Sequence, residues 1–247
     1  LRQVPVVGDQ LGNPKALSGG IAGVVIGVAV SIYGGLGVGN AVQYALNTVW
    51  TIPRNRRPNP LTSRVRSLGV VFIGGLAIVG TTTLSTLAAL DLGWFTRPVS
   101  LLVTTVANAF IINGVYRWAV SRLMPIRTHL VGSVIAALLL QFLQTFGVVY
   151  VGRIVHNASA TNGVIGFVLG LLAFVYLVSV VLVLCAEINA VRARQLYPRA
   201  LLTPFTDNVD LTEADKAAYA TQARAMRTKG YERIDVRFER EESRPPV

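Results

Sequence analysis

Five long apolar stretches, each of about twenty residues or more, place the strongest constraint on how this chain folds. They cover residues 20–50, 67–90, 98–120, 130–152 and 163–190. A helix needs about 20 apolar residues to cross the hydrocarbon core of a bilayer, and these stretches lack the apolar-polar alternation of membrane barrel strands. Because only helices and closed barrels satisfy the backbone in lipid, the sequence predicts an all-α, polytopic transmembrane helical bundle with five spans.

The composition fits a membrane protein and argues against a nucleic-acid-binding domain. Charged residues make up 14% of the chain, against about 25% in soluble domains. Residues 1–199 hold 15 of the 23 basic residues but only 3 of the 12 acidic ones. The net charge of +11 therefore belongs to the membrane part, where arginines between apolar segments can contact anionic lipids. We expect membrane lipids, and no nucleic acid, as partners.

Basic residues alternate between the connections and so predict an orientation. The segments that follow the first, third and fifth spans hold eleven of them, and the other connections hold four. Because Lys and Arg are enriched in cytoplasmic loops, we expect an extracytoplasmic loop at residues 1–19, a transmembrane domain at 20–199 and a cytoplasmic C-terminus. An odd number of spans with an outside start predicts a further, N-terminal span before Leu1.

The tail, residues 200–247, is predicted to be a small cytoplasmic appendage. Thr212 with Asp215 three residues later is a helix-start signal, and Gly230 is a plausible stop, so we expect one short helix at about 212–228. Residues 231–238 alternate apolar and charged side chains without a hairpin partner. This strand pattern lies against the helix or pairs with another chain, and we expect the end of the tail to be disordered.

Small residues recur at every fourth position of the first span. A dinucleotide-binding motif has three glycines in the pattern G-x-G-x-x-G directly after a strand. Gly35 and Gly37 fit the first two positions, but Asn40 stands at the third, and the segment is a membrane span. Small residues four apart allow helices to approach closely in lipid. We therefore predict that the glycines of this row pack against other helices: Gly23, Gly27, Gly35 and Gly39.

Polar residues near the cytoplasmic ends of the first and last spans are the candidates for a cavity. They are Asn40, Gln43, Asn47, Glu187 and Asn189. Glu187 is the only acid well inside a span, and such groups are functional candidates, although pairing with an arginine at the interface also explains it. The amides either line a cavity or hydrogen-bond neighbouring helices, and both interpretations stay open.

The loop PRNRRPNP supplies Arg54, Arg56 and Arg57, which contact anionic head groups or serve as a topology anchor. No residues suited to catalysis accompany them. His129 and His156 stand apart at segment ends and Cys185 is the only cysteine, so no metal-ligand spacing is visible. We expect no metal, no cofactor and no enzymatic activity, because Glu187 as a base lacks an accompanying nucleophile.

Several phrases resemble the YihY/BrkB group of bacterial inner-membrane proteins, once mislabelled ribonuclease BN. They are PVVGDQL and NPKALSG (5–19), YGGLGVGNAVQYALNTVWTIPRNRRP (33–58), VYVGRIVHNASATNG (149–163), GLLAFVYLVSVVLVLCAEINAVRAR (170–194) and the tail phrase LTEADKAAYATQARA, which is similar to actinobacterial members. The resemblance implies six spans with both termini cytoplasmic, the first of them absent here. Its acidic residue and asparagine in the last span correspond to Glu187 and Asn189, and its asparagine after the glycines to Asn47.

The resemblance and the polar residues together lead to two functional hypotheses. The first is a transporter or flippase of a lipid or lipid-linked envelope precursor, with a cytoplasm-facing polar cavity. The second is a non-transporting scaffold that packs through the glycine rows and recruits a partner through residues 207–238. The partners that we expect besides lipids are a further copy of the chain, in a homo-oligomer, or an envelope-biogenesis protein. Deletion of the tail is the experiment that the sequence suggests for separating them.

Overall fold

The computed structural model describes residues 20–88, 96–122, 124–157, 160–197 and 210–238. All regular structure in these ranges is helical. The long helices are α2 (Gly20–Val49), α3 (Pro60–Ala88), α4 (Thr96–Ala119), α5 (Leu130–Asn157) and α6 (Ala160–Arg194), and α7 (Glu213–Ala225) follows in the tail. Five of them are long and apolar enough to cross a membrane, which confirms the predicted all-α transmembrane bundle.

Helices α3 and α6 extend well beyond their apolar stretches. Helix α3 begins at Pro60, several residues before the predicted span at 67. Proline is favoured in the first turn of a helix, and Arg64 and Arg66 are good helix formers that continue it. Helix α6 runs from Ala160 to Arg194 for a similar reason, since its last turns carry arginines that remain helical outside the hydrocarbon.

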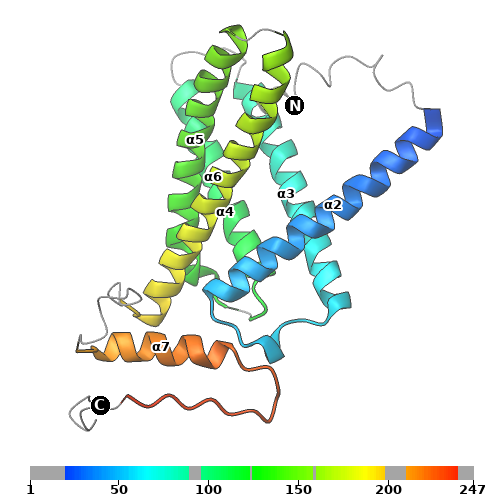
Figure 1. Cartoon of the computed structure of the whole chain (residues 1–247). Helices are drawn as coiled ribbons and strands as arrows, with labels where there is room; N and C mark the ends of the chain where they lie inside the picture. Colours follow the sequence, from blue (N-terminus) through cyan, green and yellow to red (C-terminus); the bar gives the residue numbers. More distant parts are fainter. Residues whose placement is uncertain (1–19, 89–95, 123, 158–159, 198–209, 239–247) are drawn as a thin grey trace.

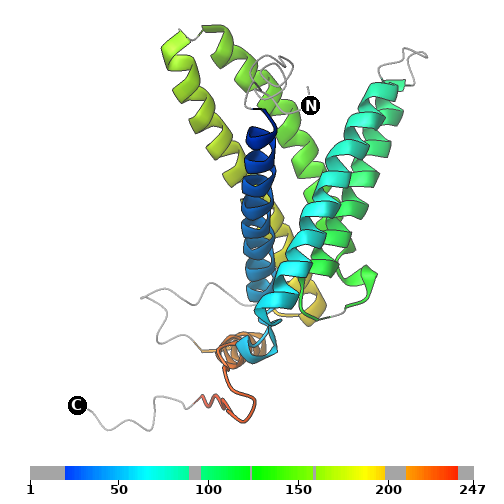
Figure 2. The same ribbon diagram turned by 90° about the vertical axis from the view of Figure 1, so that its right-hand side faces the viewer.

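The helices form antiparallel pairs that diverge from a common base. Helices α3 and α4 pack together, as do α5 and α6, and α4 also packs on α5. Figure 2 shows the two pairs spreading apart like a V, with α2 between them. Helix α2 packs on α3 and leans outward along its first half (Figure 1), where Val24, Val25 and Ile26 are all more than 60% exposed. In a bilayer such apolar side chains face lipid.

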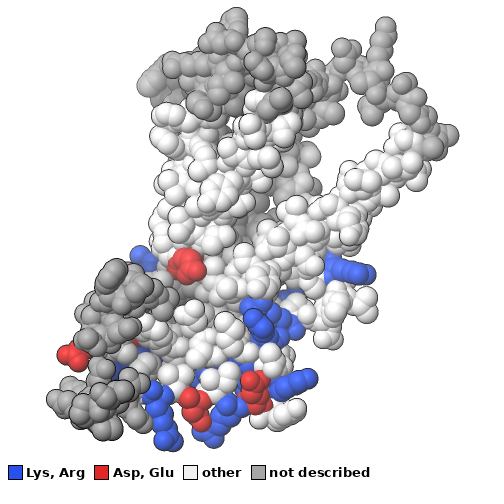
Figure 3. All heavy atoms as spheres, viewed as in Figure 1, with Lys and Arg blue, Asp and Glu red and all other residues white. Residues whose placement is uncertain are grey.

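The buried core lies at the end of the bundle where α2, α4 and α6 finish, which we call the α7 end. It is built around aromatic residues and small residues, among them Trp50, Tyr116, Ala136 and Ala186. The small residues let α5 and α6 approach closely. A Cβ added at Gly132 on α5 would collide with the carbonyl oxygen of Cys185 on α6, so only glycine fits there. The described charged residues also gather at this end (Figure 3).

Helix α7 lies across the α7 end of the bundle (Figure 1). It begins with the predicted capping box, in which the Thr212 hydroxyl accepts from the Asp215 N–H and the Asp215 side chain accepts from the Thr212 N–H. The Asn55 N–H donates to the Arg227 carbonyl at 3.2 Å, which joins the short 3-10 helix η2 (Arg54–Arg56) to the end of α7.

The segment after α7 does not form a strand within the described residues. Its alternating residues Ile234 and Val236 are half-buried, and the Phe238 ring lies 6.3 Å from the Tyr219 ring of α7, centroid to centroid. This contact places the end of the segment against α7, as one of the two interpretations predicts, and pairing with another chain stays a prediction.

Candidate functional site: a basic pocket beneath the bundle

A pocket of about 840 Å³ opens between the α7 end of the bundle and α7 itself. We call it the basic pocket, because four arginines line it and none of its described lining residues is acidic. Its lining residues are Thr51, Ile52, Pro53, Arg56, Ser121, Arg122, Arg194, Leu196, Ala217, Thr221 and Arg224. Guanidinium groups bind carboxylates and phosphates through paired hydrogen bonds, so this lining is suited to an anion.

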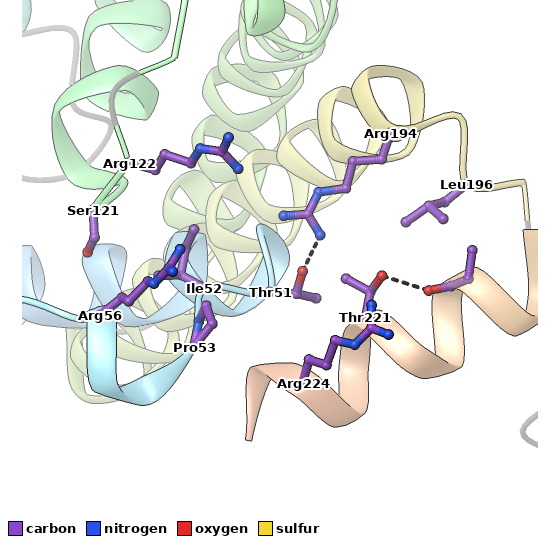
Figure 4. A pocket seen from close by; sticks show the side chains of 11 residues that line it. Thr51, Ile52, Pro53, Arg56, Ser121, Arg122, Arg194, Leu196, Thr221 and Arg224 are labelled. Carbon is purple, nitrogen blue, oxygen red and sulfur yellow. Dashed lines mark hydrogen bonds between the residues drawn. The ribbon is translucent and has the colours of Figure 1, made fainter. Parts of the chain in front are cut away.

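The four arginines come from four different segments of the chain. Arg56 lies in η2, Arg122 follows the end of α4, Arg194 ends α6 and Arg224 is in the last turn of α7. Figure 4 shows the guanidinium groups of Arg122 and Arg194 extending toward one another, with Arg224 rising from α7 on the other side. Like charges that face each other repel, and an anion between them would relieve that repulsion.

Arg194 is fixed in place by the end of α2. Its guanidinium donates to the Thr51 hydroxyl and to the Trp50 carbonyl, and it lies over the Trp50 ring at 5.8 Å from the centroid. Such a cation over an indole face is itself stabilising. Arg194 therefore joins α6 to α2 and presents its charge to the pocket in a fixed position.

Helices α2 and α6 end in the same C-terminal motif on either side of this arginine. In each, two backbone N–H groups just beyond the helix donate to backbone carbonyls of its last turns. In α2 the Ile52 N–H donates to the Asn47 carbonyl and the Thr51 N–H to the Thr48 carbonyl. In α6 the Leu196 N–H donates to the Val191 carbonyl and the Gln195 N–H to the Arg192 carbonyl. The left-handed position of such a motif is usually glycine, yet it is Thr51 (φ 45°) and Gln195 (φ 53°) here. A β-branched residue in this conformation is strained, and the Thr51 hydroxyl is the group that holds Arg194.

A smaller groove of about 340 Å³ adjoins the basic pocket, and we call it the lateral groove. It lies between α2, α6 and α7 and shares Thr51, Arg194, Leu196 and Thr221 with the basic pocket. Its own lining is largely apolar, but it also holds Arg54, Arg57 and Glu187.

Three of the five polar residues predicted for a cavity are buried and hydrogen-bonded between segments. The Gln43 side chain donates to the Ser67 hydroxyl at 2.8 Å and to the Ser63 carbonyl at 2.9 Å on α3. The Asn47 side chain accepts from the Ser121 N–H at 2.9 Å. The third, Asn189, accepts from the Gly132 N–H at 2.7 Å and donates to the His129 carbonyl at 3.1 Å.

The other two polar candidates, Asn40 and Glu187, are exposed. Asn40 accepts from the Ser63 hydroxyl at 2.6 Å on α3. Glu187 faces the lateral groove. Asn40 and Gln43 thus share the contact with Ser63 on α3, whereas Asn47, Asn189 and Glu187 lie at three other places. The basic pocket contains none of the five. A cavity lined by all five stays a prediction without a common site to support it.

The predicted head-group arginines divide between the two hollows. Arg56 lines the basic pocket, whereas Arg54 and Arg57 line the lateral groove. Arg57 is held against the end of α2: it lies over the Tyr44 ring at 5.1 Å from the centroid and donates to the Thr48 hydroxyl at 3.4 Å. Three pocket arginines, Arg122, Arg194 and Arg224, are not among the predicted site residues.

The glycine row changes character along α2. Gly39 lies directly against α3, because an added Cβ would stand 2.7 Å from the backbone of Ser67. A Cβ added at Gly35 would make an ordinary contact of 3.5 Å with Val71. A Cβ added at Gly23 or Gly27 would meet no described atom within 4 Å. Close packing is therefore seen at Gly39, while packing at Gly23 and Gly27 stays a prediction.

A buried histidine packs against Trp50 at the α7 end of the bundle. The His129 ring is 1% exposed and packs edge-on against Trp50 at 5.2 Å between centroids. Within the described part of the chain, neither ring nitrogen has a hydrogen-bond partner. Burial, and then the nearby charge of Arg117, lower the pKa of His129 below its usual 6.5, so the ring is neutral at pH 7.

Comparison with known proteins gives a family match. The family model described as virulence factor BrkB matches residues 6–207. No curated protein and no solved structure matches the chain significantly. The match covers all five apolar helices and ends before α7.

Proposed function

The chain belongs to the virulence factor BrkB family, and on this premise we propose that it is a transporter or flippase of a lipid or lipid-linked envelope precursor with an anionic head group. The observation that carries the proposal is the basic pocket, where four arginines surround about 840 Å³ without an acidic lining residue among those described. Phosphate-type head groups match the planar, multiple donors of guanidinium groups.

The position of the pocket supports an amphiphilic ligand over a soluble one. It lies directly beneath long helices whose flanks are apolar and exposed, such as α6 at Leu184 and Ile188. A head group in the pocket would leave its acyl or polyprenyl chain free to extend along these flanks into the hydrocarbon. A soluble anion would need the arginines but not this neighbouring apolar surface.

The orientation is part of the proposal. We infer that the α7 end faces the cytoplasm of a bacterium and that the helices lie in its inner membrane, with α7 on the cytoplasmic side. The supporting observation is the gathering of arginines at that end, since Lys and Arg are enriched in cytoplasmic loops. Anionic precursors made in the cytoplasm would then meet the basic pocket first.

Reconstituted transport tests the proposal. The full chain is placed in liposomes, and the movement of fluorescent phosphate-bearing and uncharged lipids between leaflets is measured. We expect faster movement of the phosphate-bearing lipid, and a loss of about tenfold or more in the Arg122→Gln, Arg224→Gln double variant, the size expected when hydrogen bonds to charged groups are removed.

Arg127→Gln is the matched control. Arg127 is also an exposed arginine at the α7 end, in η3 (Ile126–Thr128), but it lines neither hollow. We expect this variant to retain transport. Equal rates for liposomes with and without the protein would refute the proposed function, and equal losses in the double variant and the control would refute the role of the basic pocket.

A further inference from the structure

The lateral groove carries charges of both signs, unlike the basic pocket beside it. Glu187 enters it from α6, and Arg54 and Arg57 border it from the loop after α2. Its remaining lining includes apolar side chains such as Val49, Val191 and Met226. A ligand that fits this lining has a positive group, a negative group and an apolar part.

Glu187 lacks a cationic partner in the described part of the chain. Within the described residues, no hydrogen bond or ion pair joins it to the arginines of the groove, and two of these arginines bind other groups. Arg194 donates to Thr51 and Trp50, and Arg57 donates to Thr48 and to the Ile52 carbonyl at 3.4 Å. The acid and the two loop arginines thus line one hollow without a hydrogen bond or ion pair between them among the described contacts.

The depth of Glu187 makes an unpaired carboxylate costly. It lies seven residues before the last residue of α6, about 10 Å along the helix axis, inside the span that ends at Arg194. Ionisable groups at such positions mark ligand or ion sites. A cation that reaches Glu187 from the membrane side, with its own counter-charge near Arg54 and Arg57, would satisfy both ends of the groove.

We propose that the lateral groove is a binding site for a zwitterionic phospholipid with a primary ammonium group, the phosphatidylethanolamine type. The ammonium donates hydrogen bonds to the Glu187 carboxylate, the phosphate faces Arg54 and Arg57, and the acyl chains leave between α2 and α6. A primary ammonium has three N–H donors, whereas the trimethylated ammonium of phosphatidylcholine has none. The site therefore discriminates between these two lipids, and this binding does not depend on the proposed transport.

Lipid retention by the purified full chain tests this site. The protein is offered phosphatidylethanolamine, phosphatidylcholine and phosphatidylglycerol with identical acyl chains, and the bound lipids are measured by native mass spectrometry. We expect phosphatidylethanolamine to be retained about tenfold more tightly than phosphatidylcholine, as for one hydrogen bond to a charged group. Stepwise N-methylation of the head group should weaken retention progressively in the unaltered protein.

The Glu187→Gln variant should lose this preference, because the amide carries no charge. Glu213→Gln is the control: Glu213 is an exposed acid at the start of α7 that pairs with Lys216 and lines neither hollow, so its loss should leave the preference unchanged. Equal retention of ethanolamine and choline lipids by the unaltered protein, a stronger retention of phosphatidylglycerol, or a preference that survives in Glu187→Gln would each overturn the proposal.

The outcome is separable from that of the transport experiment. Ethanolamine-selective retention without lipid movement would refute the transporter and support this site. Lipid movement without ethanolamine-selective retention would support the transporter and refute this site.

Discussion

Replacing Asn189 by alanine should destabilise the protein even though no ligand is present. Asn189 on α6 accepts from the N–H of Gly132, the third residue of α5, at 2.7 Å. The first N–H groups of a helix have no partner within it, so this side chain caps α5 from a neighbouring helix. Both residues lie in the buried contact between α5 and α6, where water cannot easily replace the lost acceptor.

The magnitude follows from what loses its partner. The His129 carbonyl keeps two other donors, the Ser133 N–H and hydroxyl, so loss of the Asn189 amide leaves it satisfied. The Gly132 N–H is left buried without an acceptor, which costs about 1–3 kcal/mol, in line with about 0.5–2 kcal/mol for a lost helix cap. We expect a loss of about 2 kcal/mol in unfolding free energy.

Denaturant titration in mixed micelles measures this loss, with Asn40→Ala as the control. Asn40 also bonds a neighbouring helix, but it is exposed, and surface substitutions of this kind usually change stability by less than about 0.5 kcal/mol. The reasoning is refuted if Asn189→Ala is as stable as Asn40→Ala. A stable Asn189→Ala variant that no longer transports would instead assign Asn189 to a cavity.

Further predictions concern three other places in the structure. Gly39→Ala should destabilise the protein by about 1–3 kcal/mol, because the new Cβ would meet the backbone of α3. The Cβ of Gly37→Ala would meet no described atom within 4 Å, so this variant should be more stable by up to about 1 kcal/mol. The same denaturant titration compares the two variants. The pKa of His129 in the folded protein lies below its usual 6.5, so near that pH the unfolded chain binds more protons than the folded one. Thermal stability should therefore be full above about pH 6.5 and fall as the pH drops below it. His129→Phe should reduce this fall, measured between about pH 8 and about pH 5. Thr212→Ala removes half of the capping box and should weaken α7 by about 1 kcal/mol, seen as faster amide hydrogen exchange at residues 213–217 than at 219–225.

The sequence predicted the class of fold because the decisive physics is local. A run of about 20 apolar residues is sufficient to define a membrane helix, and the five spans and the family resemblance are both confirmed. Helix ends were less predictable. Pro60, Arg64 and Arg66 belong to α3, although their hydropathy placed them in a loop, because helix propensity continues where apolar character stops.

The tail is the element for which the sequence was least informative. Its capping box is visible in Thr212 and Asp215, but its position relative to the bundle depends on long-range contacts such as that between Asn55 and Arg227. Because α7 contributes Arg224 and Thr221 to the basic pocket, deletion of the tail would damage the pocket as well as any docking surface. Point substitutions are therefore needed to separate a transporter from a scaffold.

The sequence predicted a cavity lined mainly by amides, whereas the pocket in the structure is lined by arginines. The physical reason for this difference is only partly visible in the sequence. A buried amide must be satisfied, and at the α7 end Gln43, Asn47 and Asn189 each lie beside a donor or acceptor of another segment, so they hold helices together. Arginines at helix ends keep contact with water, and segments far apart in sequence can bring several of them together. The positive-inside pattern indicates which end they occupy, but only the packing of α6, α7 and the loops decides which four share a pocket. Substitutions of the amides should therefore change stability first, and substitutions of Arg122 and Arg224 should change ligand handling first.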